Sequence, residues 1–80
     1  MITVRFTQPG PSVTQSAKSG DRVSFSGDAG VVLRRVSGAP VSSGDFIHEG
    51  ADDSYFMECV SIGAAGVEVG RFSVASPEVV

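Results

Sequence analysis

Hydrophobic and polar residues alternate in short runs along the chain. In residues 2–7, and again in residues 22–26, every second residue is apolar. A period of two is typical of a β-strand with one buried face, because successive side chains of a strand point to opposite faces. The two runs therefore predict two strands. Their inward-facing residues are Ile2, Val4, Phe6, Val23 and Phe25.

A third apolar run, residues 31–37, has an ambiguous phase. Val31 and Leu33 share one face of the predicted strand, while Val32 and Val36 share the other. Either both faces of this strand are partly covered, or a bulge lies within it.

Two later runs complete the set of predicted strands. Residues 54–62 are apolar on both faces, with Tyr55, Met57 and Cys59 opposite Phe56, Val60 and Ile62. A strand covered on both faces belongs in the middle of a sheet. Residues 67–75 change phase between Val69 and Phe72. We therefore expect a bulge at Gly70, since glycine inside a strand often marks one.

Glycine, proline and serine separate these runs. QPGPS at residues 8–12 should end the first strand, because proline cannot donate to a sheet ladder. Residues 13–18 form either a short edge strand or an extended loop, FIHE at 46–49 is a short extended piece, and no window has a helical period. We predict one all-β domain over residues 1–80, an antiparallel sandwich or barrel of six or seven short strands. Residues 76–80 are expected to form a flexible or partner-docking tail.

Composition points to a protein that is packed against a partner. Charged residues make up 19% of the chain and hydrophobic residues 41%, whereas an average soluble domain is about 25% charged. Such a chain exposes apolar surface, which usually marks contact sites. The single cysteine excludes an internal disulfide. Self-association or a partner surface is therefore the expected source of extra stability for so small a domain.

Charge and hydropathy argue against nucleic acid and membrane partners. The net charge is −3, and the basic residues are scattered except for the pair Arg34 and Arg35. A nucleic-acid-binding protein would carry a basic patch. No apolar run approaches the ~18 residues of a membrane span, and no secretory signal opens the chain. We expect the chain to be made in the cytoplasm and to remain there, unless it is a segment cut from a longer protein.

The triplet Ser-Gly-Asp occurs at residues 19–21, 26–28 and 43–45. Aspartates can bind calcium, but known calcium loops need several converging oxygen ligands at fixed spacing. These copies are unequally spaced, and none has a second carboxylate two residues on. Tight turns prefer Gly followed by Asp, so we interpret the triplets as turns. A calcium site and an integrin-type recognition signal are the alternatives.

The acidic segment HEGADD contains four possible metal ligands, His48, Glu49, Asp52 and Asp53. It lacks the second histidine of a zinc-protease motif. We interpret it as a solvated loop with its histidine at a strand end. The alternative is that His48 titrates near neutral pH and tunes an assembly contact.

Other candidate groups predict no catalysis. Cys59 lies within a strand and lacks the cationic neighbour of a reactive thiol, so we expect a buried core cysteine. Arg34 and Arg35 face opposite ways in a strand. We therefore expect one of them to form a surface ion pair and the guanidinium group of the other to be solvated. One histidine and no G-x-S-x-G motif exclude a recognisable serine triad. We assign no catalytic, cofactor-binding or metal-binding residue and expect no cofactor; a small enzyme or metal-dependent regulator is a minor alternative.

A strand at the first residues, Ser/Gly/Val-rich all-β patterning and low charge together resemble the small virion proteins of tailed bacteriophages. The resemblance is to capsid decoration and head-fibre proteins, covers the whole chain and carries no signature residues. It implies a non-enzymatic structural protein located in the virion. Such a protein forms homo-oligomers, often trimers, and binds other virion proteins such as a major capsid protein.

Strand edges and the tail could provide the contacts with neighbouring chains that this role requires. Residues 2–7 and 68–75 could add to the sheets of neighbouring chains, and residues 76–80 could dock in a neighbour's groove. The alternative function is an Ig-like binding module, for a protein or a carbohydrate, cut from a larger adhesin or tail fibre. A sugar platform needs an exposed Trp or Tyr, but the chain has no Trp and its one Tyr lies in the predicted core strand.

Overall fold

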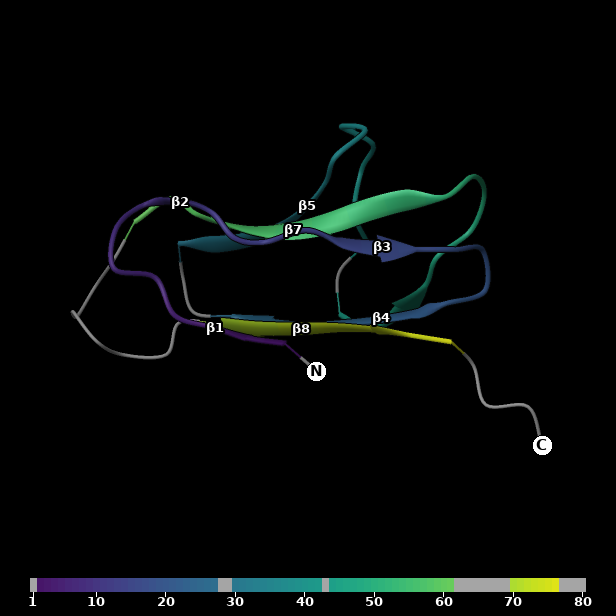
Figure 1. The fold of residues 1–80 in the computed structure, drawn as a ribbon, viewed down its shortest axis with the longest axis horizontal. Helices are drawn as coiled ribbons and strands as arrows, with labels where there is room; N and C mark the ends of the chain where they lie inside the picture. Colours follow the sequence, from purple (N-terminus) through teal and green to yellow (C-terminus); the bar gives the residue numbers. More distant parts are fainter. Residues whose placement is uncertain (1, 28–29, 43, 62–69, 77–80) are drawn as a thin grey trace.

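The computed structural model describes residues 2–27, 30–42, 44–61 and 70–76. In this part of the chain the strands form two antiparallel sheets, stacked as two layers, and there is no helix (Figure 1). Six strands have three residues or more, and two further strands have two residues each. The predicted all-β class is confirmed, and the architecture is a pair of packed sheets.

The first sheet has the strand order β1, β8, β4, β6. β8 (Gly70–Ala75) lies between β1 (Ile2–Val4) and β4 (Arg22–Gly27), and β6 (Phe46–Ile47) pairs with the other side of β4. Among the described residues β1, from the first sequence run, is thus an edge strand, as expected. The expectation that the last run is also an open edge is wrong, because β8 has a partner on each side.

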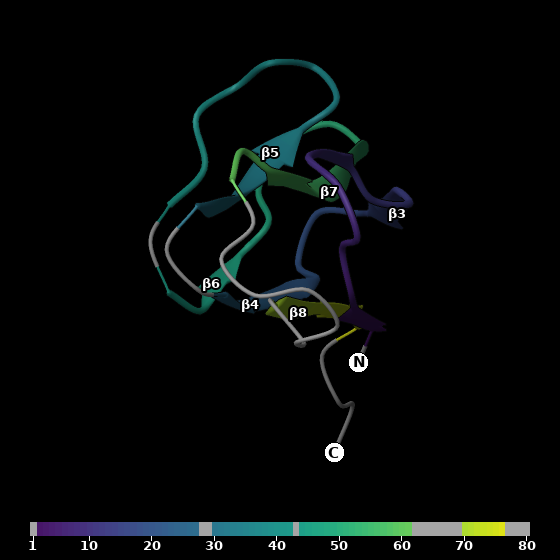
Figure 2. The same cartoon turned by 90° about the vertical axis from the view of Figure 1, so that its left-hand side faces the viewer.

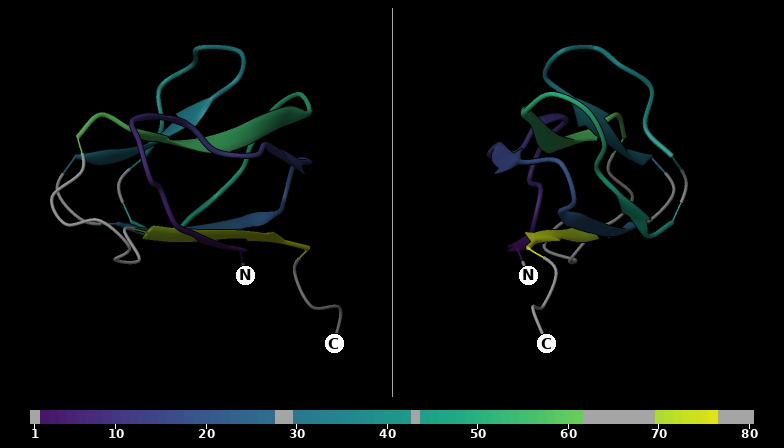
Figure 3. Two further views of the ribbon diagram at one scale, coloured as in Figure 1. Left: turned by 60° about the vertical axis from the view of Figure 1, so that its left-hand side comes forward. Right: turned by 90° about the vertical axis from the view of Figure 1, so that its right-hand side faces the viewer.

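The second sheet is built around β7 (Asp53–Cys59). β5 (Val31–Arg35) pairs along one side of β7, while β2 (Gly10–Pro11) and β3 (Gln15–Ala17) share its other side. The central position predicted from the two-sided apolar pattern of β7 is confirmed. Figure 2 and Figure 3 show the two sheets as separate layers, with the chain passing from β5 in one layer to β6 in the other.

β2 and β3 make one interrupted edge. Pro11 lies opposite Glu58, so an unbroken ladder would place Thr14 opposite Tyr55, but Gln15 is found there. One extra residue on the edge strand is a β-bulge. The bulge separates β2 from β3 and keeps the inward-facing residues of β3 in phase with the core.

The structure confirms one prediction about this region and resolves another. The first strand ends before the segment 8–12, at Val4, and Gly10 and Pro11 pair in the other sheet, because proline is tolerated on an edge strand. Residues 13–18 contain the edge strand that was one of their two alternatives. Edge strands carrying proline and a bulge are poor templates for further pairing.

β5 and β8 both run without a bulge. In β5, Val31 and Leu33 are buried, whereas Val32 is exposed, so only one face of this strand is covered. β8 pairs continuously with β4 from Gly70 to Ala75. The two valines before Gly70 that suggested a phase change lie outside the described residues.

The core fills the space between the sheets. It contains Phe6 and Val23, which the period-2 pattern places inward, while Val4 and Phe25 are half-buried and pack against it. The buried apolar residues are Phe6, Ala17, Val23, Val31, Leu33, Tyr55, Met57, Cys59 and Phe72.

We expect Gly30→Ala to destabilise the fold more than Gly38→Ala. Both glycines have a left-handed backbone, with φ of 94° and 85°, which costs a side-chain-bearing residue about 1–2 kcal/mol. A Cβ at Gly30 would also lie 2.3 Å from Ser61 Oγ, whereas a Cβ at Gly38 would meet nothing within 4 Å. Urea denaturation should show the larger loss for Gly30→Ala; equal losses would mean that Ser61 moves aside freely.

Candidate functional site

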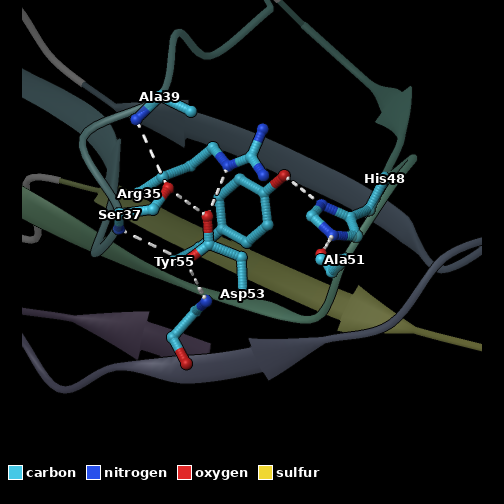
Figure 4. Close-up of polar contacts among 8 residues, drawn as sticks. Arg35, Ser37, Ala39, His48, Ala51, Asp53 and Tyr55 are labelled. Atoms are coloured by element: carbon cyan, nitrogen blue, oxygen red, sulfur yellow. Dashed lines mark hydrogen bonds and ion pairs between the residues drawn. The ribbon is translucent and has the colours of Figure 1, made fainter.

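A cluster of polar groups lies between β5, β7 and the loops that follow β5 and β6 (Figure 4). Asp53 Oδ2 accepts hydrogen bonds from Arg35 Nε at 2.8 Å and from Ser37 Oγ at 2.5 Å, and its Oδ1 accepts one from the Ser54 N–H at 2.7 Å. The bonds from Ser37 and Ser54, together with Arg35, hold the pKa of Asp53 well below its ordinary value, although burial opposes them. The Asp53 side chain is 8% exposed, so the carboxylate faces its protein donors more than it faces water.

Tyr55 and His48 form the interior half of this cluster. Both are 1% exposed, the Tyr55 hydroxyl lies 2.7 Å from His48 Nδ1, and His48 Nε2 lies 2.9 Å from the Ala51 carbonyl. A carbonyl can only accept, so in the neutral ring Nε2 carries the proton and Nδ1 accepts from the Tyr55 hydroxyl. Burial raises the pKa of Tyr55, and Arg35 lies over its ring at 5.7 Å.

This arrangement is suited to holding loops in place rather than to catalysis. Each hydrogen-bonding atom of His48 and each carboxylate oxygen of Asp53 already has a protein partner. A general base or a nucleophile needs a free position for substrate within hydrogen-bond reach. The cluster instead ties the segments around Ser37 and Ala51 to β7.

A hollow of about 250 Å³ lies beside this cluster, between β5 and the loop that follows it. Arg34 and Arg35 are its charged lining residues, and the others are Leu33, Gly38, Ala39, Pro40 and Val41. Arg34 is paired with Glu58, and Arg35 with Asp53 at 2.8 Å. The expectation of one solvated arginine is therefore wrong, because the opposite-facing side chains each meet a carboxylate of β7.

The outward-facing side chains of β5, β7 and the residues next to them make a largely apolar surface, which we call the outer face. Val36 is 60% exposed, Val60 is 54% exposed and Val32 is 36% exposed. Phe56 is half-buried, and the ion pair between Arg34 and Glu58 lies among these residues. The outer face comprises Val32, Arg34, Val36, Ser54, Phe56, Glu58 and Val60.

The opposite side of the molecule is polar. The outward positions of β4, β8 and β6 include one large apolar residue, Ile47, which is 51% exposed. A shallow hollow of about 100 Å³ crosses this side and is lined partly by Ser24, Ser26, Arg71 and Ser73. The two sheets therefore present surfaces of contrasting chemistry to their surroundings.

The first Ser-Gly-Asp triplet, residues 19–21, forms a turn as predicted. Gly20 has a φ of 95°, and Asp21 Oδ2 accepts the Lys18 N–H at 2.9 Å. The Gly20 N–H donates to the His48 carbonyl, and the His48 N–H donates to the Asp21 carbonyl, each at 2.8 Å. These hydrogen bonds connect the turn before β4 to the end of β6.

The other two triplets are described only in part. In residues 26–28 the serine and the glycine belong to β4, so this described portion is strand rather than turn, and the aspartate lies outside the described residues. In the third triplet the serine lies outside them. Gly44 there has a φ of 69°, and Asp45 forms an ion pair with Arg22 at 3.4 Å.

The HEGADD segment divides between surface and interior. Glu49 and Asp52 are exposed, as expected for a solvated loop, and His48 directly follows β6, which confirms its place at a strand end. His48 itself is buried rather than solvated. Tyr55, seven residues later, supplies the buried partner that makes this possible. Among the described residues, no three His, Cys, Asp or Glu side chains are grouped so that they could hold a metal ion. A role for His48 in tuning an assembly contact stays a prediction.

Cys59 and the tail complete the candidates from the sequence. Cys59 is 2% exposed and its Sγ donates to the Ser61 carbonyl at 3.3 Å, which confirms a buried core cysteine. Residues 77–80 of the predicted tail lie outside the described residues.

Sequence reasoning missed the link between Arg35, Ser37 and Asp53. A signal was present, because Arg35 has the parity of the inward-facing Val31 and Leu33, and Asp53 has that of Tyr55. Opposite charges at inward positions of two strands predict a shielded ion pair.

No family model, no curated protein and no solved structure matches this chain. The described residues contain no helix that is long and apolar enough to span a bilayer.

Proposed function

We propose that this protein is a non-enzymatic structural component of a viral particle, a capsid decoration or minor virion protein. It is made in the host cytoplasm, binds copies of itself and other virion proteins such as a major capsid protein, and is present in many copies. The resemblance to phage virion proteins implies that it forms homo-oligomers. The exposed apolar outer face of the second sheet is the observation that carries the proposal.

The chemistry of the outer face supports a contact role. Exposed apolar patches on small soluble domains usually mark interaction sites, and the cores of protein interfaces are poor in charged residues. Three exposed valines and Phe56 fit such a core, with one ion pair among them. The polar side of the first sheet fits a surface that stays in contact with water.

The Ig-like binding module is the second candidate, and the two-sheet architecture favours it. A carbohydrate platform needs an exposed aromatic ring that can stack on a sugar. Tyr55 is 1% exposed, so a module of this kind would be expected to bind a protein ligand.

The proposal predicts that the chain sediments with virus particles and that Val60→Lys strongly weakens this association. Particles purified on a density gradient from cultures that produce the chain should contain it in many copies. A lysine buried without a partner costs more than the ~1.4 kcal/mol that correspond to a tenfold loss of binding. Val60→Lys should therefore leave at least about tenfold fewer copies on the particle.

Ile47→Lys is the matched control, because Ile47 is 51% exposed and Val60 is 54% exposed, but they lie on different sheets. Its association with particles should equal that of the wild type. Particles free of the chain would refute the virion role. Equal loss in both variants would refute the assignment of the contact to the outer face.

A further inference from the structure

We propose that a second copy of this chain covers the outer face through a two-fold, face-to-face contact. In this contact Arg34 of each copy lies against Glu58 of the other copy. The inference deepens the proposed function, on which it rests for the outer face being a contact surface. It adds the identity of the occupant and the symmetry of the contact.

The register of β5 and β7 sets the pattern at the centre of the outer face. Val32 lies opposite Glu58, and Arg34 lies opposite Phe56. The four outward side chains therefore form a checkerboard, with the two charges on one diagonal and the two apolar residues on the other. Neighbouring strands of one sheet lie ~4.8 Å apart, and residues on the same face of one strand lie ~6.8 Å apart. All four side chains therefore fit within one contact.

This checkerboard is self-complementary. A two-fold axis lying in the contact plane along the diagonal from Val32 to Phe56 exchanges the positions of Arg34 and Glu58. Each charge then meets its opposite on the second copy, while Val32 and Phe56 each face their own symmetry mate. Isologous contacts require self-complementarity of this kind. The strands of the two copies cross steeply, as in orthogonal sheet packing.

The ion pair within one chain does not satisfy its charges fully. The Arg34 side chain is 53% exposed and that of Glu58 is 36% exposed, so both groups still depend on water. A partner without opposite charges would remove that water and leave the pair poorly compensated. A second copy supplies an opposite charge to each member, while the exposed valines at Val36 and Val60 add apolar contact around the centre.

Residues 36–42 rise from the end of β5 above the second sheet, on the side away from the first sheet (Figure 1, Figure 2). A second copy on the outer face would therefore lie against this loop as well, and the first sheet would stay free in both copies.

Charge reversal tests the contact. In size-exclusion chromatography with light scattering, the wild type should run as a dimer of the 8.2 kDa chain. Arg34→Glu alone places Glu against Glu twice per dimer, and Glu58→Arg alone places Arg against Arg twice. Each should weaken dimerisation at least about tenfold. Mixing the two variants should restore the dimer, because one chain then offers two acids and the other two arginines.

Arg22→Glu is the matched control, because it breaks the Arg22–Asp45 ion pair on the other sheet, whose side chains are 65% and 53% exposed. It should leave the dimer unchanged. Circular dichroism checks that every variant is folded. If either charge variant unfolds, Val32→Lys and Val32→Asp replace them, since Val32 faces its own mate. Each alone should dissociate the dimer and their mixture should restore it.

A monomeric wild type, a trimer mass, or folded variants that do not restore the dimer on mixing would each overturn the inference. The sedimentation of the chain with virus particles tests the proposed function independently of this contact. A restored dimer that never sediments with particles would keep this contact and refute the virion role. A monomer found on particles in many copies would keep the virion role and show that another virion protein occupies the outer face.

Discussion

Tyr55→Ala should lower the free energy of unfolding by about 3–5 kcal/mol, the range for removing a fully buried aromatic ring. The Tyr55 ring packs on Phe46 at 5.9 Å and on His48 at 5.5 Å between centroids. A domain of this length has a total stability of only about 4–12 kcal/mol. The variant should therefore lose a large part of its stability in urea denaturation followed by circular dichroism.

Tyr55→Phe separates the hydroxyl from the ring. It keeps the packing but leaves His48 Nδ1 buried without its donor, which should cost about 1–3 kcal/mol. The loss should be clearly smaller than that of Tyr55→Ala. A Tyr55→Phe protein as stable as the wild type would show that the hydrogen bond to His48 does not contribute to the fold.

Acidification should remove the stabilisation that Asp53 provides. The pKa of its carboxyl is lowered in the folded protein, so the unfolded chain, with an ordinary value of about 3.9, takes up the proton first. The contribution is therefore complete above about pH 5 and is lost as pH falls through the unfolded value toward the lower folded one. Thermal unfolding between pH 3 and pH 7 should show Asp53→Asn less stable than the wild type at neutral pH, with the difference narrowing in acid.

Asp45→Asn is the control for this experiment. It removes an exposed ion pair with Arg22, a kind of contact that contributes about 0–1 kcal/mol. Its effect at neutral pH should be smaller than that of Asp53→Asn, because the Asp53 carboxylate accepts four hydrogen bonds from Arg35, Ser37 and Ser54. Parallel pH curves for the wild type and Asp53→Asn would contradict the assigned role of the Asp53 carboxylate.

The period-2 pattern was enough to predict the fold class and the inward positions of Phe6 and Val23. It works because each strand has one face against the other sheet, so that burial alternates, as at Val31 and Leu33 of β5. The two-sided apolar pattern of β7 likewise predicted its central place. These features depend only on residues close together in the sequence.

Strand order was the part that sequence could not give. Whether β8 is an edge strand or a central strand depends on β1, whose residues are far away in the chain. The alternation of apolar and polar residues does not indicate which strands pair with each other. The burial of His48 was missed for the same reason. The residues that follow it include Glu49, Asp52 and Asp53, and the hydroxyl to which it is hydrogen-bonded comes from a different strand. The outer face was foreseen only as exposed apolar surface, without its location.

The central place of β8 also sets an order of assembly. Every strand of the second sheet has been synthesised once Cys59 is made, whereas the first sheet lacks its middle strand until Gly70–Ala75 follows. Pairing Ile2 with Phe72 then closes a loop of nearly the whole chain, and such long-range closures are slow steps in folding. A nascent chain still missing β8 on the ribosome would therefore have all the strands of one sheet, while the core side of that sheet lacks the cover that β8 provides.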